Sequence, residues 1–187
     1  MTTGTISRSL IAVAVAIGCA ACDSKHTEDP SATATPPATA PLPPPAAPVS
    51  VIHTNDVKAG TQLLSGFYNI EANAWRWTAG KFSVSLAVPP GAAQNGGTLT
   101  FAFAISDGAI KKLGDITLSA AVNGTALPPT KYAKAGNTEY TASIPASVLT
   151  GDTVKVDFAL DKSVPPTPGV DGRQLGVIAS SIALKSK

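Results

Sequence analysis

The sequence predicts an all-β domain, an antiparallel β-sandwich of jelly-roll-like type, behind a disordered N-terminal region. From Val51 onward, strand-length apolar runs alternate with clusters of Gly, Pro, Asn and Asp every ten to fifteen residues. Within these runs the apolar residues occupy every second position, which is typical of strands with one buried face. No run carries the sustained three- and four-residue apolar spacing of a helix, so we expect little helix. Seven or eight short strands in about 135 residues are typical of a β-sandwich, and that size can bury a core without disulfides.

The first 22 residues have the pattern of an export signal. Arg8 precedes the apolar run 10–17, which is too short to span a bilayer and fits the central region of a signal peptide. Small residues before a cysteine then resemble the lipobox of bacterial lipoproteins, with Cys19 as the expected lipidation site and Cys22 as the alternative. The resemblance implies a lipid anchor in the cell envelope. Ala20 after Cys19 favours the outer membrane, whereas Asp23 after Cys22 would favour retention in the inner membrane. An ordinary cleaved signal with incidental cysteines is the competing interpretation.

Residues 23–50 form a linker dominated by Pro, Ala and Thr. Proline fixes φ and removes the amide donor, so neither helix nor sheet is expected here. The run predicts an extended polyproline spacer of about 3.1 Å per residue, which would hold the domain at residues 51–187 away from its anchor.

The first half of the domain contains three strands with clear alternation. Phe82, Val84, Leu86 and Val88 share one face of the first, and a polar loop with Asn95-Gly96-Gly97 follows. The next strands cover residues 98–105 and 116–122. The other face of 98–105 is made of Thr and Ala, small enough to pack beneath another element. Asn123-Gly124 then predicts a type I′ hairpin turn.

The second half continues the pattern. A strand is expected around residues 140–144, one helical turn within 145–151 and a further strand at 154–160. A Pro-rich loop at 163–172 precedes the last strand, 175–184. In this strand the apolar residues change from odd to even positions, so we predict a β-bulge near Ser180 and Ser181.

The aromatic residues point to one stretch, Gly66 to Val88, which contains both tryptophans. Trp75 and Trp77 lie two residues apart, so in a strand their indoles share one face. Together with Tyr68 they are candidates for stacking on sugar rings. Burial in the core is the competing interpretation, and it is favoured for Trp77 and equally weighted for Trp75.

Four charged residues stand out in a domain that is poor in charge, namely Glu71, Arg76, Asp171 and Arg173. They can form a polar site that binds sugar hydroxyls through paired hydrogen bonds. The interpretation we favour is a structural ion pair between the Pro-rich loop and the preceding strand. The pairing of Asp171 with Arg173 is the most informative one to examine, because Asp171 can also cap its own turn.

Composition argues against several other classes of function. Both cysteines precede the domain, so a Cys/His zinc site is excluded there, and no acidic loop suggests calcium. We therefore expect no metal and no cofactor. The basic residues are scattered and the net charge is only +2, so nucleic acid is not an expected partner. No convincing acid/base pair or nucleophile elbow is present, and we expect no enzymatic activity.

Several motifs occur in the order of a known type of module. They are Gly66-Phe67-Tyr68, Glu71, Arg76-Trp77-Thr78, Val122-Asn123-Gly124 and Asp171-Gly172-Arg173-Gln174-Leu175-Gly176-Val177. Together they resemble the β-sandwich modules, similar to carbohydrate-binding modules of galactose-binding-like type, that accompany bacterial glycosyltransferases. The resemblance covers nearly all of residues 60–186 and implies a jelly-roll fold with glycan association. Unlike those modules, we expect this one to follow an export signal and a linker without a fused catalytic domain.

The sequence therefore favours a membrane-anchored, non-catalytic module that binds a cell-envelope or extracellular polysaccharide. The alternative is a structural or protein-interaction subunit of an envelope assembly with no sugar site. A glycan-binding surface requires exposed indole beside hydrogen-bonding groups, whereas an interaction subunit predicts buried tryptophans and an apolar patch elsewhere.

Overall fold

The computed structural model describes residues 47–187, so the export-signal pattern, Cys19, Cys22 and most of the linker lie outside the described residues. Within that range the strands are β1 (Val51–His53), β2 (Leu63–Glu71), β3 (Trp75–Ala87), β4 (Gly97–Ile105), β5 (Ile116–Val122), β6 (Thr125–Ala126), β7 (Thr130–Tyr132), β8 (Gly136–Ile144), β9 (Thr153–Leu160) and β10 (Ile178–Ser186). The helices are α1 (Ala92–Asn95), α2 (Asp107–Leu113) and the 3₁₀-helices Val57–Thr61 and Ala146–Val148.

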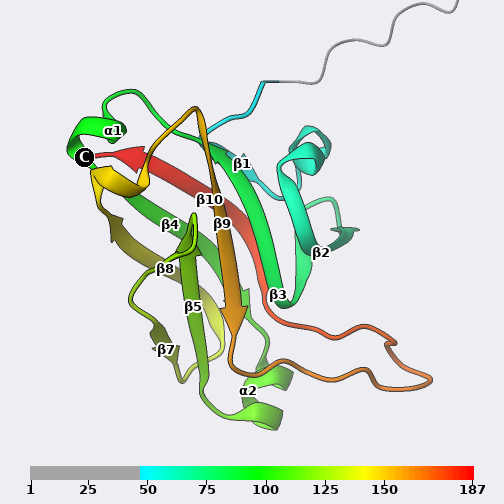
Figure 1. Ribbon diagram of the computed structural model, residues 1–187. Helices are drawn as coiled ribbons and strands as arrows, with labels where there is room; N and C mark the ends of the chain where they lie inside the picture. The colour runs from blue at the N-terminus through cyan, green and yellow to red at the C-terminus, as the bar shows by residue number, and fades with distance from the viewer. Residues whose placement is uncertain (1–46) are drawn as a thin grey trace, which may run out of the picture. The chain divides into compact units, whose positions relative to one another are not determined.

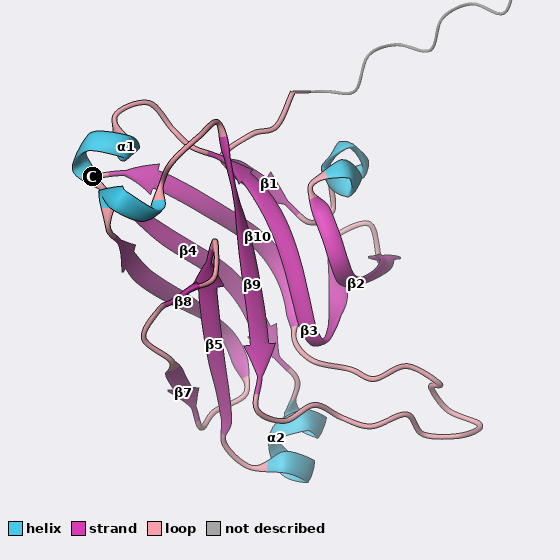
Figure 2. Ribbon diagram, viewed as in Figure 1, coloured by secondary structure: helices cyan, strands magenta, loops and turns pink. Residues whose placement is uncertain are grey.

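Strand β3 joins the two layers of a sandwich (Figures 1 and 2). Its first residues pair with β10, where Trp77 lies opposite Ile178, and its later residues pair with β9, where Phe82 lies opposite Phe158. One layer continues from β9 to β5, and the other continues from β10 through β4 to β8. Every pairing is antiparallel. The predicted antiparallel β-sandwich is confirmed.

The core lies between the two layers and is centred on three phenylalanines. Phe82 stacks on Phe158 with ring centroids 5.0 Å apart, and Phe101 from the opposite layer lies 5.5 and 5.1 Å from them. All three side chains are at most 2% exposed. They stand at alternate positions of their strands with Val and Leu as neighbours, as the two-residue periodicity predicted.

Two local predictions are confirmed. Asn123 and Gly124 have φ of 47° and 82° and join β5 to β6, as a type I′ turn requires. The register of β10 against β4 shifts between Ala179 and Ser181, so Ser180 is the extra residue of the expected bulge.

Two other features were not expected from the sequence. The stretch from Gly66 to Val88 is a hairpin of β2 and β3, turned at Ala72 and Asn73 with φ of 50° and 53°. Helix α2 follows β4, and the Ser106 hydroxyl caps it by accepting a hydrogen bond from the Ala109 amide at 3.1 Å. Alanine is uncommon at positive φ, and α2 has only seven residues, so neither feature has a strong pattern in the sequence.

The Pro-rich connection between β9 and β10 is the long excursion in Figure 1. Val164 pairs with Leu175 and Thr167 with Asp171, so the segment folds back on itself as a narrow hairpin. At its tip Val170 is 86% exposed.

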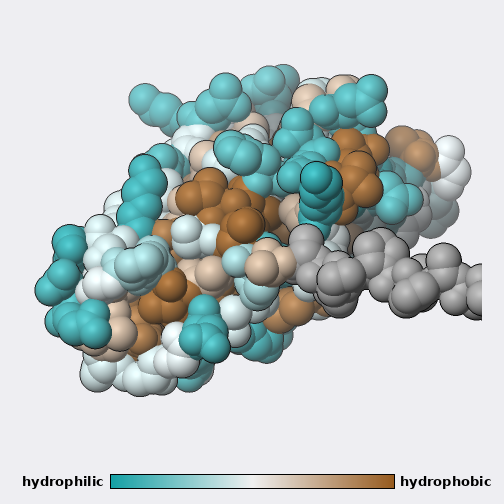
Figure 3. All heavy atoms as spheres, turned by 90° about the horizontal axis from the view of Figure 1, so that it is seen from above, coloured by the Kyte–Doolittle hydropathy of each residue, from teal (hydrophilic) through white to brown (hydrophobic). Residues whose placement is uncertain are grey.

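The surface carries exposed apolar side chains near the start of the described chain. Val49, Val51, Val57 and Leu64 are 40–79% exposed. Figure 3 shows one face of the molecule, on which hydrophobic residues form separate patches among polar ones. In the described part of the chain, no helix has the length and apolar character needed to cross a membrane.

Candidate functional site

The two tryptophans lie on the outward face of β3. Trp75 is opposite Glu71 of β2, and Trp77 is opposite Ile178 of β10. Thr78 between the layers is fully buried, whereas both indoles are only half-buried. Trp77, for which burial in the core was favoured, is therefore a partly accessible residue on the outer surface.

The charged residues form a cluster around Arg173. Its Nε and Nη2 donate to the two oxygens of Asp171 at 3.0 and 2.9 Å, and its Nη1 donates to Glu71 Oε1 at 2.7 Å. The guanidinium also lies over the Tyr68 ring, 5.0 Å from its centroid. The Asp171–Arg173 ion pair is present within the excursion, and the Arg173–Glu71 ion pair joins the excursion to β2, as the favoured interpretation requires.

This geometry limits what the cluster can do chemically. Hydrogen bonds from Arg173 hold the pKa of Asp171 below its usual value of 3.8. A general acid for glycoside cleavage requires the opposite shift, toward a protonated carboxyl group. One face of Tyr68 is covered by the guanidinium, so sugar stacking is restricted to the other face.

Arg76 points away from the tryptophans and binds main-chain oxygens. Its Nε donates to Thr54 O at 2.7 Å and its Nη1 to Tyr68 O at 2.9 Å. Through these contacts Arg76 joins the segment after β1 to β2, which is a structural role.

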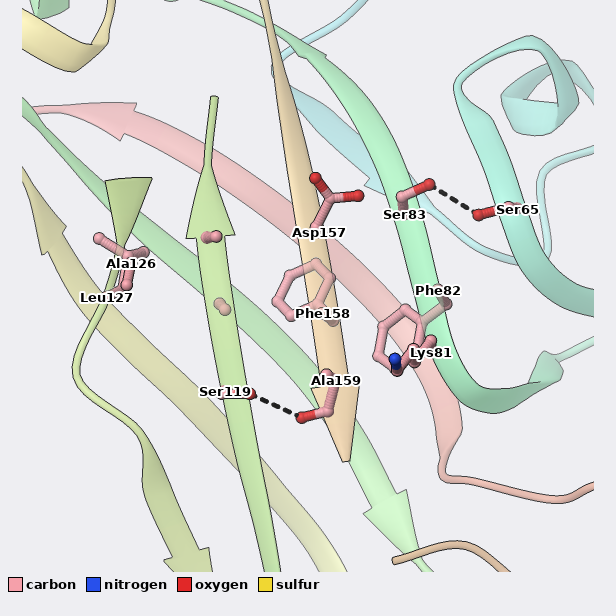
Figure 4. Close-up of a pocket in the computed structure, with 12 residues that line it drawn as sticks. Ser65, Lys81, Phe82, Ser83, Ser119, Ala126, Leu127, Asp157, Phe158 and Ala159 are labelled. Carbon is pink, nitrogen blue, oxygen red and sulfur yellow. Dashed lines mark hydrogen bonds between the residues drawn. The ribbon is translucent and has the colours of Figure 1, made fainter. Parts of the chain in front are cut away.

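A groove that sequence reasoning missed crosses the outer face of β5, β9 and β3 (Figure 4). Its volume is about 380 Å³, and its lining includes Ser65, Lys81, Ser83, Ser119, Ala121, Asp157 and Ala159. These residues come from neighbouring strands in register: Ser65 opposite Ser83, Ser83 opposite Asp157, and Asp157 opposite Ala121.

The groove is hollow because its floor consists of small outward side chains. Ala121, Ala159 and the serines leave space above the sheet, while Ser65 of β2 and Leu127 after β6 border it. The Ser65 and Ser83 hydroxyls lie 2.8 Å apart, and Ser119 donates to the main-chain oxygen of Ala159 at 3.1 Å. Ser65 and Ser119 are exposed, so their hydroxyls retain hydrogen-bonding capacity for a ligand, whereas Ser83 is only 5% exposed.

A second cavity of about 320 Å³ adjoins the groove and shares Lys81 with it. It is lined by residues of β3, the end of β9 and the excursion, among them Asp161, Lys162 and Gln174. The Tyr68 hydroxyl donates to Gln174 O at 2.9 Å. The groove and the Arg173 cluster are thus connected through the base of the excursion.

The sequence alone does not reveal the groove, because its residues become neighbours only through the register of the strands. Lys81, Ser83 and Asp157 occupy the polar half of alternating strands, a pattern that also describes any solvated sheet face.

In the described part of the chain, no group of three or more His, Cys, Asp or Glu side chains is placed to hold a metal ion.

Comparison with known proteins gives distant structural likenesses. No family model and no curated protein matches the chain. A family 35 carbohydrate-binding module from Clostridium thermocellum superposes with a TM-score of 0.42 at 13% identity, covering 73% of this chain and 98% of the module. A CBM36 module in complex with calcium and xylotriose gives a TM-score of 0.40 at 11% identity, covering 73% and 100% of the two chains.

A CBM36 domain of a multidomain xylanase from the hindgut metagenome of Trinervitermes trinervoides gives 0.41 at 9% identity, covering 73% of this chain and 96% of that domain. These neighbours are carbohydrate-binding modules. With TM-scores below 0.5, they do not establish a ligand or a family for this chain.

Proposed function

We propose that this chain is an exported, lipid-anchored, non-catalytic module that binds a cell-envelope or extracellular polysaccharide in the groove over β5, β9 and β3. The observation that carries the proposal is the groove itself. It is open to solvent, about 380 Å³ in volume, and lined by hydroxyl, carboxylate and ammonium groups above small apolar side chains. Sugars present hydroxyl groups together with apolar C–H faces, and this lining complements both.

The test compares two outward, half-buried alanines in central strands of opposite layers. Ala121→Trp fills the groove, whereas Ala102→Trp places the same indole on the outer face of β4. Affinity electrophoresis of the full chain against a panel of bacterial polysaccharides should show retardation that Ala121→Trp abolishes and Ala102→Trp preserves. Retardation by no polysaccharide, or equal retardation of both variants, would overturn the proposal. Near-ultraviolet circular dichroism checks that both variants fold.

Tryptophan fluorescence distinguishes the groove from the Trp75–Trp77 surface. Neither indole lines the groove, so glycan bound there should leave the emission and its quenching by acrylamide unchanged. A glycan that shifts the emission and protects it from acrylamide would instead assign binding to Trp75 and Trp77.

The anchor is tested separately by labelling cells with a fatty acid. Lipidation at Cys19 predicts that Cys19→Ser removes the label from the chain and releases it from the membrane fraction. Loss of the label in Cys22→Ser alone would assign the anchor to Cys22. A wild-type chain that takes up no label would indicate an ordinary cleaved signal.

The second candidate function is protein interaction within an envelope assembly. It is favoured by the exposed apolar residues Val49, Val51, Val57 and Leu64, which fall within sixteen residues of one another. Replacing Val57 and Leu64 by Ser should weaken such an association and leave polysaccharide binding unchanged, as measured by co-purification and affinity electrophoresis.

A further inference from the structure

Lys81 occupies a distinctive position on the outward face of β3. It is exposed, lies opposite Ala159 of β9, and lines both the groove and the adjoining cavity. Figure 4 shows it on β3 next to Phe82, on the same strand as Ser83. A ligand that extends from one cavity into the other must pass beside its ammonium group.

The other charged residues that line these cavities already have protein partners. Asp157 pairs with Lys155 at 2.8 Å, and Asp161 accepts a hydrogen bond from the Thr117 amide at 2.7 Å. Lys162 donates to the main-chain oxygen of Leu113 at 3.1 Å. Among residues 47–187, the Lys81 ammonium group makes no hydrogen bond or ion pair, although the main chain of Lys81 belongs to the β3–β9 ladder.

A cation without a partner at the junction of two cavities selects for negative charge in the ligand. Its three N–H donors face solvent and are available to a ligand, and an anionic acceptor makes a stronger hydrogen bond than a neutral hydroxyl group. The exposed hydroxyls of Ser65 and Ser119, which also line the groove, are suited to sugar hydroxyls. The lining therefore combines one ammonium group that has no protein partner with neutral polar groups.

We propose that Lys81 is an anion-binding subsite and that the polysaccharide bound in the groove is acidic, with a carboxylate or a sulfate or phosphate ester at this position. The inference rests on the proposed glycan-binding function and adds the chemical class of the glycan. The shared chemistry is a negatively charged sugar substituent within hydrogen-bonding distance of Nζ.

The experiment measures affinity for pairs of glycans with the same backbone, one with a charged substituent and one with that substituent esterified or removed. The carboxylate arm uses polygalacturonate and its methyl ester, and the ester arm uses a sulfated galactan and its desulfated form. Calorimetric titration of the full chain should show preference for the charged member in one arm, which identifies the substituent. Lys81→Gln should lower that affinity about threefold to tenfold and bring it to the level of the neutral member, while Lys81→Arg retains the preference.

Lys185→Gln is the matched control, because Lys185 is an exposed lysine on the outward face of β10 in the opposite layer. Equal losses in Lys81→Gln and Lys185→Gln would indicate general attraction to polyanions and overturn the inference. Equal wild-type affinity for charged and neutral members would also overturn it, yet leave the groove as a neutral glycan site. Failure of the proposed function itself would be recognised differently, by binding that is absent or unaffected by Ala121→Trp.

Discussion

At the scale of single residues, Arg173 shows how a charged cluster in a charge-poor domain becomes a structural element. Its three donor groups face two carboxylates, and Tyr68 lies against its plane. The three side chains of the ion pairs are roughly one-third exposed, so solvent screens the interaction. The cluster therefore fixes the base of the excursion more than it adds to the stability of the whole domain.

Arg173→Met should lower the thermal midpoint by a modest amount, about 2–4 °C, because partly exposed ion pairs contribute little. The same substitution should increase hydrogen exchange in the excursion, since it removes the link to Glu71. Hydrogen-exchange mass spectrometry measures the excursion and the rest of the domain in one experiment. An unchanged exchange rate at residues 163–175 would show that the cluster does not hold this segment.

The stability of the fold should also depend on pH through Asp171. Its pKa is lower in the folded state than the usual value of 3.8, so its charged form stabilises the fold above about pH 4. This contribution is lost as the pH falls below 3.8 through the folded-state pKa. Urea titrations from pH 7 to pH 2.5 should show a steeper loss of stability in wild type than in Asp171→Asn. Parallel curves would contradict the assignment.

At the scale of elements, the β2–β3 hairpin depends on a close approach at Gly66. Gly66 has φ of +75°, and a Cβ atom there would overlap the Lys81 carbonyl oxygen and lie 2.7 Å from the Phe82 Cα. Only glycine meets both conditions, so the close approach of β2 to β3 at this position requires it. The register shifts of β2 against β3 are consistent with this bend.

Gly66→Ala should destabilise the domain by about 2–5 kcal/mol, from strain and overpacking together. Gly108→Ala is the control, because Gly108 lies exposed in α2 and an added Cβ has no neighbour within 4 Å. That substitution should stabilise the domain by about 0.5–1 kcal/mol. Urea unfolding of both variants gives the comparison, and a neutral Gly66→Ala would contradict the account of this bend.

The sequence was informative where side chains alternate and turns have a specific chemistry. The strands around Phe82, Phe101 and Phe158, the turn at Asn123-Gly124 and the bulge at Ser180 could all be predicted. The turn at Ala72-Asn73 could not, because tertiary pairing of β2 with β3 imposes positive φ on a residue that disfavours it.

The candidate site was harder to predict than the fold. The Asp171–Arg173 pair follows from residues two apart in one turn, so local sequence suggested it. The groove brings together Ser65, Ser83, Asp157 and Ala121 from β2, β3, β9 and β5, and only the strand order reveals that they are neighbours. Polar residues on a sheet face are common, so their identity alone does not signal a site.

At the scale of the whole molecule, the outer faces of the two layers differ in shape and chemistry. The β5–β9–β3 face is hollowed and carries Lys81 and Asp157, whereas the β4 outer face presents Thr98, Thr100, Ala102 and Ala104. Because β3 belongs to both layers, its outward residues run from the half-buried tryptophans to the groove. A ligand site on this molecule must therefore be assigned to a particular face.

The most direct test of the account is to map a bound polysaccharide by amide chemical shifts in a two-dimensional ¹H–¹⁵N spectrum of the chain. Groove binding should perturb amides around Ser83, Ser119 and Asp157 and leave those of β4 unchanged. Perturbations confined to Trp75 and Trp77, or no perturbation by any polysaccharide of the panel, would contradict the assignment of the groove as the glycan site.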